Sequence, residues 1–412
     1  MIQKAGIYRI VAFLTGGLCL GAQTQLGLAD AVASALRSRP SLQAEAERVL
    51  VAEGLRRQAG LFPNPEFQFQ NENLRPGQTY TRDVDTLALI NQPLDILGKH
   101  RERVAAAGED RGYAQAQYQL VRRQLAQRVK VAYWAARGAQ EIRQAWNLTL
   151  ENFARIIEFH QGRLTAGAIA EQDLLRVRLE GERLKVSADL ATLEAGRARI
   201  ELLREMGRTE ITEVVLTETL EPPGEFTPVP IERVMAERLE IQVARAALRQ
   251  AEANAKLQDI SARPDLTVTL GYKRTQLPDA LTGVNTALAS LRITLPVFDK
   301  NQGNRAAAQA EVRRHQLLLS AAEADVRADY LAALQEYEFH REEFVKTLEP
   351  LRQHAAEISR IAAAAYAEGG TDLLRLLDAE RVGLDAELAR TTGLVEYRQS
   401  IAKLEAAEGM DQ

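Results

Sequence analysis

The chain of 412 residues has few of the residues that build a large globular core or a disulfide framework. Aromatic residues make up only 5% and charged residues 26%, a balance closer to long helices than to a compact globule. The single cysteine, Cys19, lies near the amino terminus, so a mature chain without that segment has no disulfide and no cysteine metal ligand. No later segment is a continuous apolar run of the roughly 20 residues that a membrane helix needs. Any membrane crossing must therefore be made by strands.

Residues 1–22 have the order of a secretory signal peptide. Lys4 and Arg9 precede the apolar run from Ile10 to Leu20, and small residues follow it, as in a cleavable leader. The run is about half of the roughly 20 residues of a bilayer span. We therefore predict export and cleavage near residue 22. A leucine precedes Cys19 where a lipoprotein signal has a small residue, which favours removal of the leader over acylation of Cys19 and leaves both open.

The sequence also lacks the motifs of an enzyme or a nucleic-acid-binding protein. The formal net charge is -4, whereas nucleic-acid binding requires a basic surface. No glycine-rich phosphate loop and no set of nucleophile, base and orienting residue is recognisable. The carboxylates are scattered beside arginines, where solvated pairing is usual. We predict no enzymatic activity, no cofactor and no nucleic-acid partner.

The five histidines do not have the i, i+4 spacing of a helical zinc site. His340 and His354 share one helix face, but a rise of roughly 21 Å separates them. We predict that the histidines are packed or hydrogen-bonded along helices and that the chain has no metal site. These histidines are His100, His160, His315, His340 and His354.

The chain repeats one plan at a spacing of about 200 residues. "FPNPEFQFQNEN" corresponds to "ARPDLTVTLGYKRT", and "LALINQPLDILGKHRER" corresponds to "ASLRITLPVFDKNQGNRAA". In the second pair each strand is predicted to stop at a proline, Pro93 or Pro296. Apolar residues then follow 4-3 heptad spacing from Leu125 to Leu164, and again in the same phase from Val326 to Ala365, which predicts a coiled-coil seam in each copy.

Each copy reads as helix, strand, turn, strand, very long helix, tight turn and helix. Helices from Lys99 to about Leu164 and from Gln302 to about Ala367 would each approach roughly 100 Å, and Pro350 should kink or split the second. The predicted domains are the leader at 1–22, a first repeat at 23–207, a linker or small belt at 208–230 and a second repeat at 231–409.

Four strands are predicted, at Glu66 to Asn73, Thr86 to Gln92, Asp265 to Gln276 and Ala287 to Leu295. Their alternation puts apolar and polar residues on opposite faces. Strands of this length suit an outer-membrane barrel and also a small soluble sheet. Four strands cannot close a barrel, so in lipid several chains must pool their strands. The residues predicted to face lipid are Phe67, Phe69, Leu266, Val268, Leu270, Tyr272, Leu291 and Ile293.

These segments resemble the TolC-like outer membrane factor family over essentially the whole mature chain. "LGLADAVASALRSRPSLQAEAE" and the duplicated strand and turn segments carry the likeness, and "QPLDILGKHR" is most similar to the heavy-metal efflux branch typified by CzcC. The resemblance implies a mainly α fold with transmembrane β structure and an internal two-fold repeat. It implies a homotrimer in which four strands per chain form a twelve-stranded β-barrel in outer-membrane lipid, continued by a long periplasmic α-helical coiled-coil barrel.

The resemblance also implies partners and a gate. A periplasmic membrane fusion protein and an inner-membrane pump of the resistance-nodulation-division (RND) class would dock through the hairpin turns, at Thr165, Gly167, Gly369 and Gly370. The family closes its periplasmic end with a constriction beyond each turn, often ringed by aspartates. The matching positions here are Asp173, Arg375 and Asp378, where Arg375 replaces an acid and changes the charge of the ring or forms a salt bridge with either aspartate.

The sequence thus predicts a passive outer-membrane exit duct for heavy-metal cations. A drug-efflux or type I secretion duct is an alternative within transport. A soluble periplasmic coiled-coil adaptor is the alternative from another class, in which the strands form a small sheet.

Overall fold

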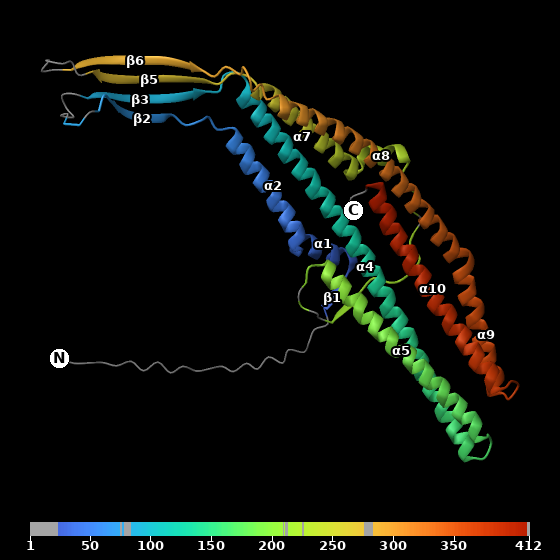
Figure 1. Cartoon of the computed structure of the whole chain (residues 1–412). Helices are drawn as coiled ribbons and strands as arrows, with labels where there is room; N and C mark the ends of the chain where they lie inside the picture. The colour runs from blue at the N-terminus through green and yellow to red at the C-terminus, as the bar shows by residue number, and fades with distance from the viewer. Residues whose placement is uncertain are drawn as a thin grey trace, which may run out of the picture.

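The computed structural model describes residues 24–74, 76–77, 84–208, 210, 213–224, 226–275 and 283–409. The leader predicted at 1–22 lies outside this range. A sheet projects from one end of a long bundle of helices, and two helical hairpins end at the other (Figure 1). In chain order the elements are β1 (Thr24–Leu26), α1 (Leu28–Ser38), α2 (Pro40–Ala59), β2 (Glu66–Glu72), β3 (Asp85–Leu94), α4 (Lys99–Thr165), α5 (Glu171–Glu205), β4 (Val214–Leu216), α6 (Ile231–Glu237), α7 (Leu239–Ser261), β5 (Leu266–Thr275), β6 (Val284–Ile293), α8 (Gln302–Glu343), the π-helix η1 (Phe344–Leu348), α9 (Glu349–Ala367) and α10 (Leu373–Glu408).

The duplicated order of elements is confirmed. The series α1, α2, β2, β3, α4 and α5 recurs as α6, α7, β5, β6, α8 to α9 and α10. Helix α4 has 67 residues, which is about 100 Å at 1.5 Å per residue. It packs against α2 and α5 of its own copy and against α7 and α10 of the other. The two copies therefore form one continuous helical body.

The predicted seams account for the buried side of α4 and of α8, but the second seam is wrong beyond η1. There Leu351, Ile358 and Ile361, which it placed on the buried side, are 44% to 53% exposed, because the wider π turn shifts the phase of the helix that follows it. In α4, Leu125 and Val129 are fully buried, and Phe153 and His160 continue the same side. In the second copy the buried side is formed by Val326, Tyr330, Ala333, Tyr337 and Phe344. Alanine at many seam positions lets the helix axes approach closely.

Pro350 neither breaks the second long helix nor ends it. The five-residue π-helix η1 joins α8 to α9, with the Glu349 amide donating to the Phe344 carbonyl oxygen five residues back. Proline has no amide hydrogen, so a regular α-helix would leave one carbonyl oxygen without its partner. The wider π turn accommodates that irregularity just before the proline, and the helical path continues.

The segment between the copies crosses three long helices. Strand β4 pairs in parallel with β1, and Arg137 of α4 donates to the Glu218 carbonyl oxygen at 2.7 Å. Tyr330 of α8 donates to Val229, and Arg398 of α10 donates to the Glu221 carbonyl oxygen. These hydrogen bonds fix the segment across the middle of the bundle.

None of the helices in the described residues is long and apolar enough to cross a membrane. The predicted strands are present, with two corrections. Strand β6 begins at Val284 and ends at Ile293, where Ala287 and Leu295 were predicted. Strand β3 does not stop at Pro93 but continues to Leu94. Strand β2 begins only at Glu66, opposite Asn91, so that side of Pro93 lies at an open edge where no amide hydrogen is needed.

Candidate functional sites

The four long strands form one antiparallel sheet in the order β2, β3, β5 and β6. Phe67 lies opposite Ile90, Ile90 opposite Leu270, and Leu270 opposite Ala289. Residues that lie opposite each other in a sheet share a face, and every second residue joins them. This register puts all eight residues that were predicted to face lipid on one face, together with Ala88 and Ile90.

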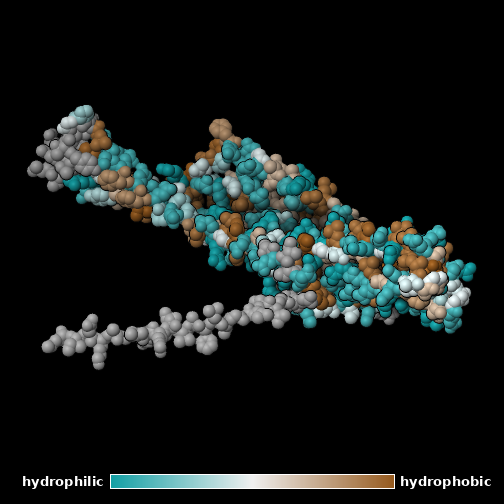
Figure 2. Space-filling view, turned by 90° about the horizontal axis from the view of Figure 1, so that it is seen from below, coloured by the Kyte–Doolittle hydropathy of each residue, from teal (hydrophilic) through white to brown (hydrophobic). Residues whose placement is uncertain are grey.

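This apolar face is open to the surroundings. Phe67 is 71% exposed, Leu270 57% and Leu291 59%. The sheet extends beyond the helices, which leave the face uncovered (Figure 1). Hydrophobic side chains also reach the surface elsewhere along the molecule (Figure 2). An apolar face of this kind is unfavourable in water and needs an apolar environment.

The opposite face is mainly polar and more enclosed. It carries Thr269, which is 6% exposed and donates its hydroxyl to the Asn91 side-chain oxygen at 2.6 Å, and Lys273, which pairs with Glu72 at 3.1 Å. Leu87 is buried among them. A Cβ at Gly271 would lie 2.6 Å from the carbonyl oxygen of Ala88. Glycine is therefore required where β5 passes close to β3.

The paired motifs at the strand-to-helix junctions hold the sheet on the bundle. Asp95 of "QPLDILGKHR" accepts from the His100 amide at 2.8 Å and from Arg103 at 3.0 Å, which supports the start of α4. Lys99 pairs with Asp265 of the second copy at 2.7 Å. Because this pair crosses between the copies, it fixes β5 relative to the start of α4.

Both hairpin turns lie at the end of the bundle farthest from the sheet (Figure 1). Gly167 has a φ of 71° and Gly369 a φ of 78°, a left-handed conformation that favours glycine at a helix end. Gly370 follows, and its amide donates to the Ala365 carbonyl oxygen at 2.7 Å. Thr165 ends α4 and donates its hydroxyl to the Gln161 carbonyl oxygen. Both turns are thus exposed and are closed by hydrogen bonds within the chain.

The predicted gate residues lie just beyond these turns. Asp173 is half-buried in the first turn of α5, and Arg375 and Asp378 are exposed in the first two turns of α10. All three are described residues, and within the chain no ion pair joins Arg375 to either aspartate. The salt-bridge alternative is therefore not formed inside one chain. Burial raises the pKa of Glu380, which follows on α10.

Sequence reasoning missed a charged cluster beside η1. Glu349 of α9 accepts hydrogen bonds from Arg390 of α10 at 2.7 Å and from Arg352 at 2.9 Å. Burial opposes ionisation of this carboxyl group, but these hydrogen bonds prevail and hold its pKa at about 2. Only the i, i+3 spacing of Glu349 and Arg352 is visible in the sequence, because Arg390 reaches the cluster from another helix.

The sequence model of a family described as outer membrane efflux protein matches residues 31–208 and 231–410. The cobalt-zinc-cadmium resistance protein CzcC of Cupriavidus metallidurans is 26% identical over 364 residues, covering 88% of this chain and 85% of that protein. Among solved structures, the Campylobacter jejuni CmeC outer membrane channel has a TM-score of 0.77 at 18% identity, covering 93% of this chain and 85% of that one. The outer-membrane channel OprN has a TM-score of 0.73 at 23% identity, covering 93% and 89%.

Proposed function

Because the chain belongs to the outer membrane efflux protein family, we propose that it is the passive outer-membrane duct of a tripartite efflux system and that its cargo is heavy-metal cations. Family membership makes it an outer-membrane channel protein with a long periplasmic helical part, not an enzyme. The alternative of a soluble periplasmic adaptor is therefore wrong.

The observation that carries the proposal is the exposed apolar face of a sheet with two open edges. Strands β2 and β6 form these edges, and each has a further strand on only one side among the described residues. Exposed edges and apolar side chains together are stable in a bilayer only if the sheet closes. Since β2 and β6 run in opposite directions, β6 of one copy can pair antiparallel with β2 of the next.

Three copies are the smallest ring that leaves a passage. Two copies would give eight strands, and the interior of an eight-stranded barrel is filled by side chains. Three copies give twelve strands and a wider lumen lined by the polar face. The proposed assembly is therefore a homotrimer with the residues around Leu270 against lipid.

The helices also support the association of chains into a trimer. Helix α5 carries a stripe of exposed apolar residues that its own chain leaves uncovered, with exposures of 53% to 61%. Such a stripe at heptad-like spacing fits against a helix of a neighbouring chain. Its members are Leu175, Leu179, Val186 and Leu190. Three chains joined in this way would surround a periplasmic tunnel.

At the tunnel end, the turns around Gly167 and Gly369 would receive a membrane fusion protein, which connects the duct to an RND pump. The gate would be formed by Asp173, Arg375 and Asp378 from the three chains. A ring of charged side chains biases which ions pass. The pump supplies the energy, so the duct itself needs no catalytic group.

The cargo proposal rests on the likeness to the cobalt-zinc-cadmium resistance protein. A drug-efflux or type I secretion duct has the same architecture and is the competing assignment. Growth assays separate them: a strain lacking the gene should become more sensitive to Co²⁺, Zn²⁺ or Cd²⁺ and regain tolerance with the gene restored. Unchanged metal tolerance with increased sensitivity to dyes or antibiotics would favour a drug-efflux duct.

The assembly is tested by extracting the outer-membrane fraction with detergent and measuring the mass of the purified particle. A particle of three chains that precipitates without detergent is expected. A monomer or dimer that stays in solution without detergent would contradict the barrel.

A further inference from the structure

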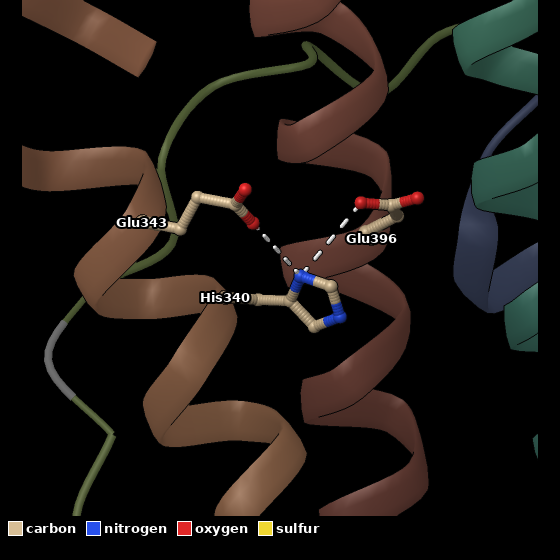
Figure 3. Close-up of side chains that lie close together, drawn as sticks. All are labelled: His340, Glu343 and Glu396. Atoms are coloured by element: carbon tan, nitrogen blue, oxygen red, sulfur yellow. Dashed lines mark ion pairs between the residues drawn. The ribbon is translucent and has the colours of Figure 1, made fainter. Parts of the chain in front are cut away.

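A histidine and two glutamates from two helices converge where α8 passes into η1. His340 and Glu343 lie three residues apart on one face of α8, and Glu396 approaches them from α10 (Figure 3). Nδ1 of His340 lies 3.6 Å from a carboxylate oxygen of Glu343 and 3.7 Å from one of Glu396. Within the described residues, no other group of three or more His, Cys, Asp or Glu side chains converges in this way.

Nδ1 of His340 has no ordinary partner at this position. The atom is inaccessible to solvent and accepts or donates no hydrogen bond, because both carboxylates lie beyond hydrogen-bond distance. Buried polar atoms in folded proteins are almost always paired. In the described part of the chain, moreover, no lysine or arginine lies within ion-pair distance of Glu343 or Glu396. Two carboxylates thus face one imidazole without a cation.

The surrounding packing fixes the three side chains. The residues next to the two glutamates in sequence, Phe344 and Tyr397, are buried, and their rings lie 6.2 Å apart. A Cβ at Gly393 would lie 2.1 Å from a methyl carbon of the η1 leucine, so glycine lets α10 pass close to η1. Glu396 stands about one turn beyond Gly393 and is thereby brought within reach of α8.

We propose that His340, Glu343 and Glu396 bind a divalent metal cation of the zinc type. Bond lengths of about 2.0 to 2.2 Å place tetrahedral zinc ligands about 3.4 Å apart, close to the 3.6 and 3.7 Å from the imidazole to the two carboxylates. One imidazole and two carboxylates suit such an ion. Coordination through Nδ1 leaves the imidazole proton on Nε2.

The site is open enough for the ion to enter. The side chain of Glu343 is 36% exposed and that of Glu396 48%, so water can supply the fourth ligand. A bound ion would tie α8 to α10 beside η1, the irregular turn of the long helix. This role is that of a resident cation and holds whichever cargo the duct carries.

The test is a titration of the purified full-length protein in detergent with Zn²⁺, after treatment with a chelator and without a polyhistidine tag. Calorimetry should show one site per chain, and Zn²⁺ should raise the melting temperature. His340→Ala and Glu396→Gln should each weaken that site about tenfold or more. Glu396→Gln keeps the shape of the side chain, so it separates lost binding from failed folding.

His315→Ala provides the matched control. His315 lies on α8 with Nε2 3.3 Å from a carboxylate oxygen of Glu311, but among the described residues no His, Cys, Asp or Glu of a second helix completes a group of three with this pair. Its removal should leave the titration unchanged. The proposal would be overturned if Glu396→Gln bound Zn²⁺ as tightly as the wild-type protein, or if the wild-type protein bound no Zn²⁺. Neither result would alter the sedimentation or mass expected of the duct.

Discussion

Replacing Leu270 by arginine tests the assignment of the apolar sheet face most directly. Leu270 is the fifth of ten residues in β5, and its side chain is 57% exposed on the uncovered face. In a closed barrel it would lie against lipid near the middle of the bilayer. Arginine at that depth costs about 2 to 4 kcal/mol relative to an apolar residue, and the cost recurs in every chain of the assembly.

The control lies on the opposite face of the neighbouring strand. Ser290 is exposed and faces Thr269 across the strand pair, so Ser290→Arg would place the same charge in the aqueous lumen. Thr269 itself is a poor control because it is only 6% exposed and hydrogen-bonded to Asn91. We expect Leu270→Arg to lower the amount of trimer extracted from outer membranes, and Ser290→Arg to leave it near wild type.

The assay compares trimer recovered at equal expression, by mass determination in detergent. A second readout is the temperature at which the trimer dissociates. Equal losses for Leu270→Arg and Ser290→Arg would refute the assignment of the two faces. So would an unchanged trimer for Leu270→Arg, because a charge at mid-membrane cannot be accommodated without cost.

Three further predictions concern the sheet, the charged cluster and the gate. Gly271→Ala should lower trimer stability by about 1 to 3 kcal/mol, measured as a lower dissociation temperature, because its Cβ would lie 2.6 Å from a carbonyl oxygen of β3. Glu349 has a folded-state pKa of about 2, below its ordinary 4.5. Its ionised carboxyl group therefore adds at most about 3 kcal/mol to the free energy of unfolding, and this contribution is complete above pH 4.5 and is lost as the pH falls toward 2. Glu349→Gln should therefore lower the melting temperature at pH 7 and reduce its dependence on pH in that window. Arg375→Ala and Asp378→Ala should change single-channel conductance or cation preference in planar bilayers.

Each of these predictions has a contrary outcome that can be observed. If the Gly271→Ala trimer dissociated at the same temperature as the wild-type trimer, β3 and β5 could move apart without a loss of trimer stability. A Glu349→Gln variant that keeps the full pH dependence would show that other carboxyl groups dominate acid unfolding. Conductance and selectivity that stay unchanged in both gate variants would remove Arg375 and Asp378 from the constriction.

Periodicity in the sequence was enough to predict most of the architecture. The heptad spacing identified the buried side of α4 from Leu125 to His160, because a helix places such residues on one side whatever its partner is. The period of two likewise separated Phe67 and Leu270 from the polar residues of the sheet. Duplication of the strand and turn motifs predicted the order of elements in both copies, which the structure confirms.

The local sequence pattern did not predict where a strand or helix ends when that end depends on a neighbouring element. The sequence predicted that Pro93 ends a strand, but β3 continues past it because β2 pairs with β3 only as far as Asn91. The sequence predicted a kink or a break at Pro350, yet the π turn before it accommodates the lack of an amide hydrogen and the helix continues. In both cases the consequence of a proline is set by its hydrogen-bonding surroundings, which sequence spacing does not contain.

The sequence by itself determined which residues share a face, because that follows from the backbone period alone. Only the tertiary structure decided which faces meet. It aligned Phe67 with Leu270 across three strands, brought Arg390 to Glu349, and placed Glu396 beside His340 and Glu343. These pairs join elements far apart in the chain, and their meeting depends on helix packing, strand register and the close approach at Gly393, all of which arise only when the two copies fold together.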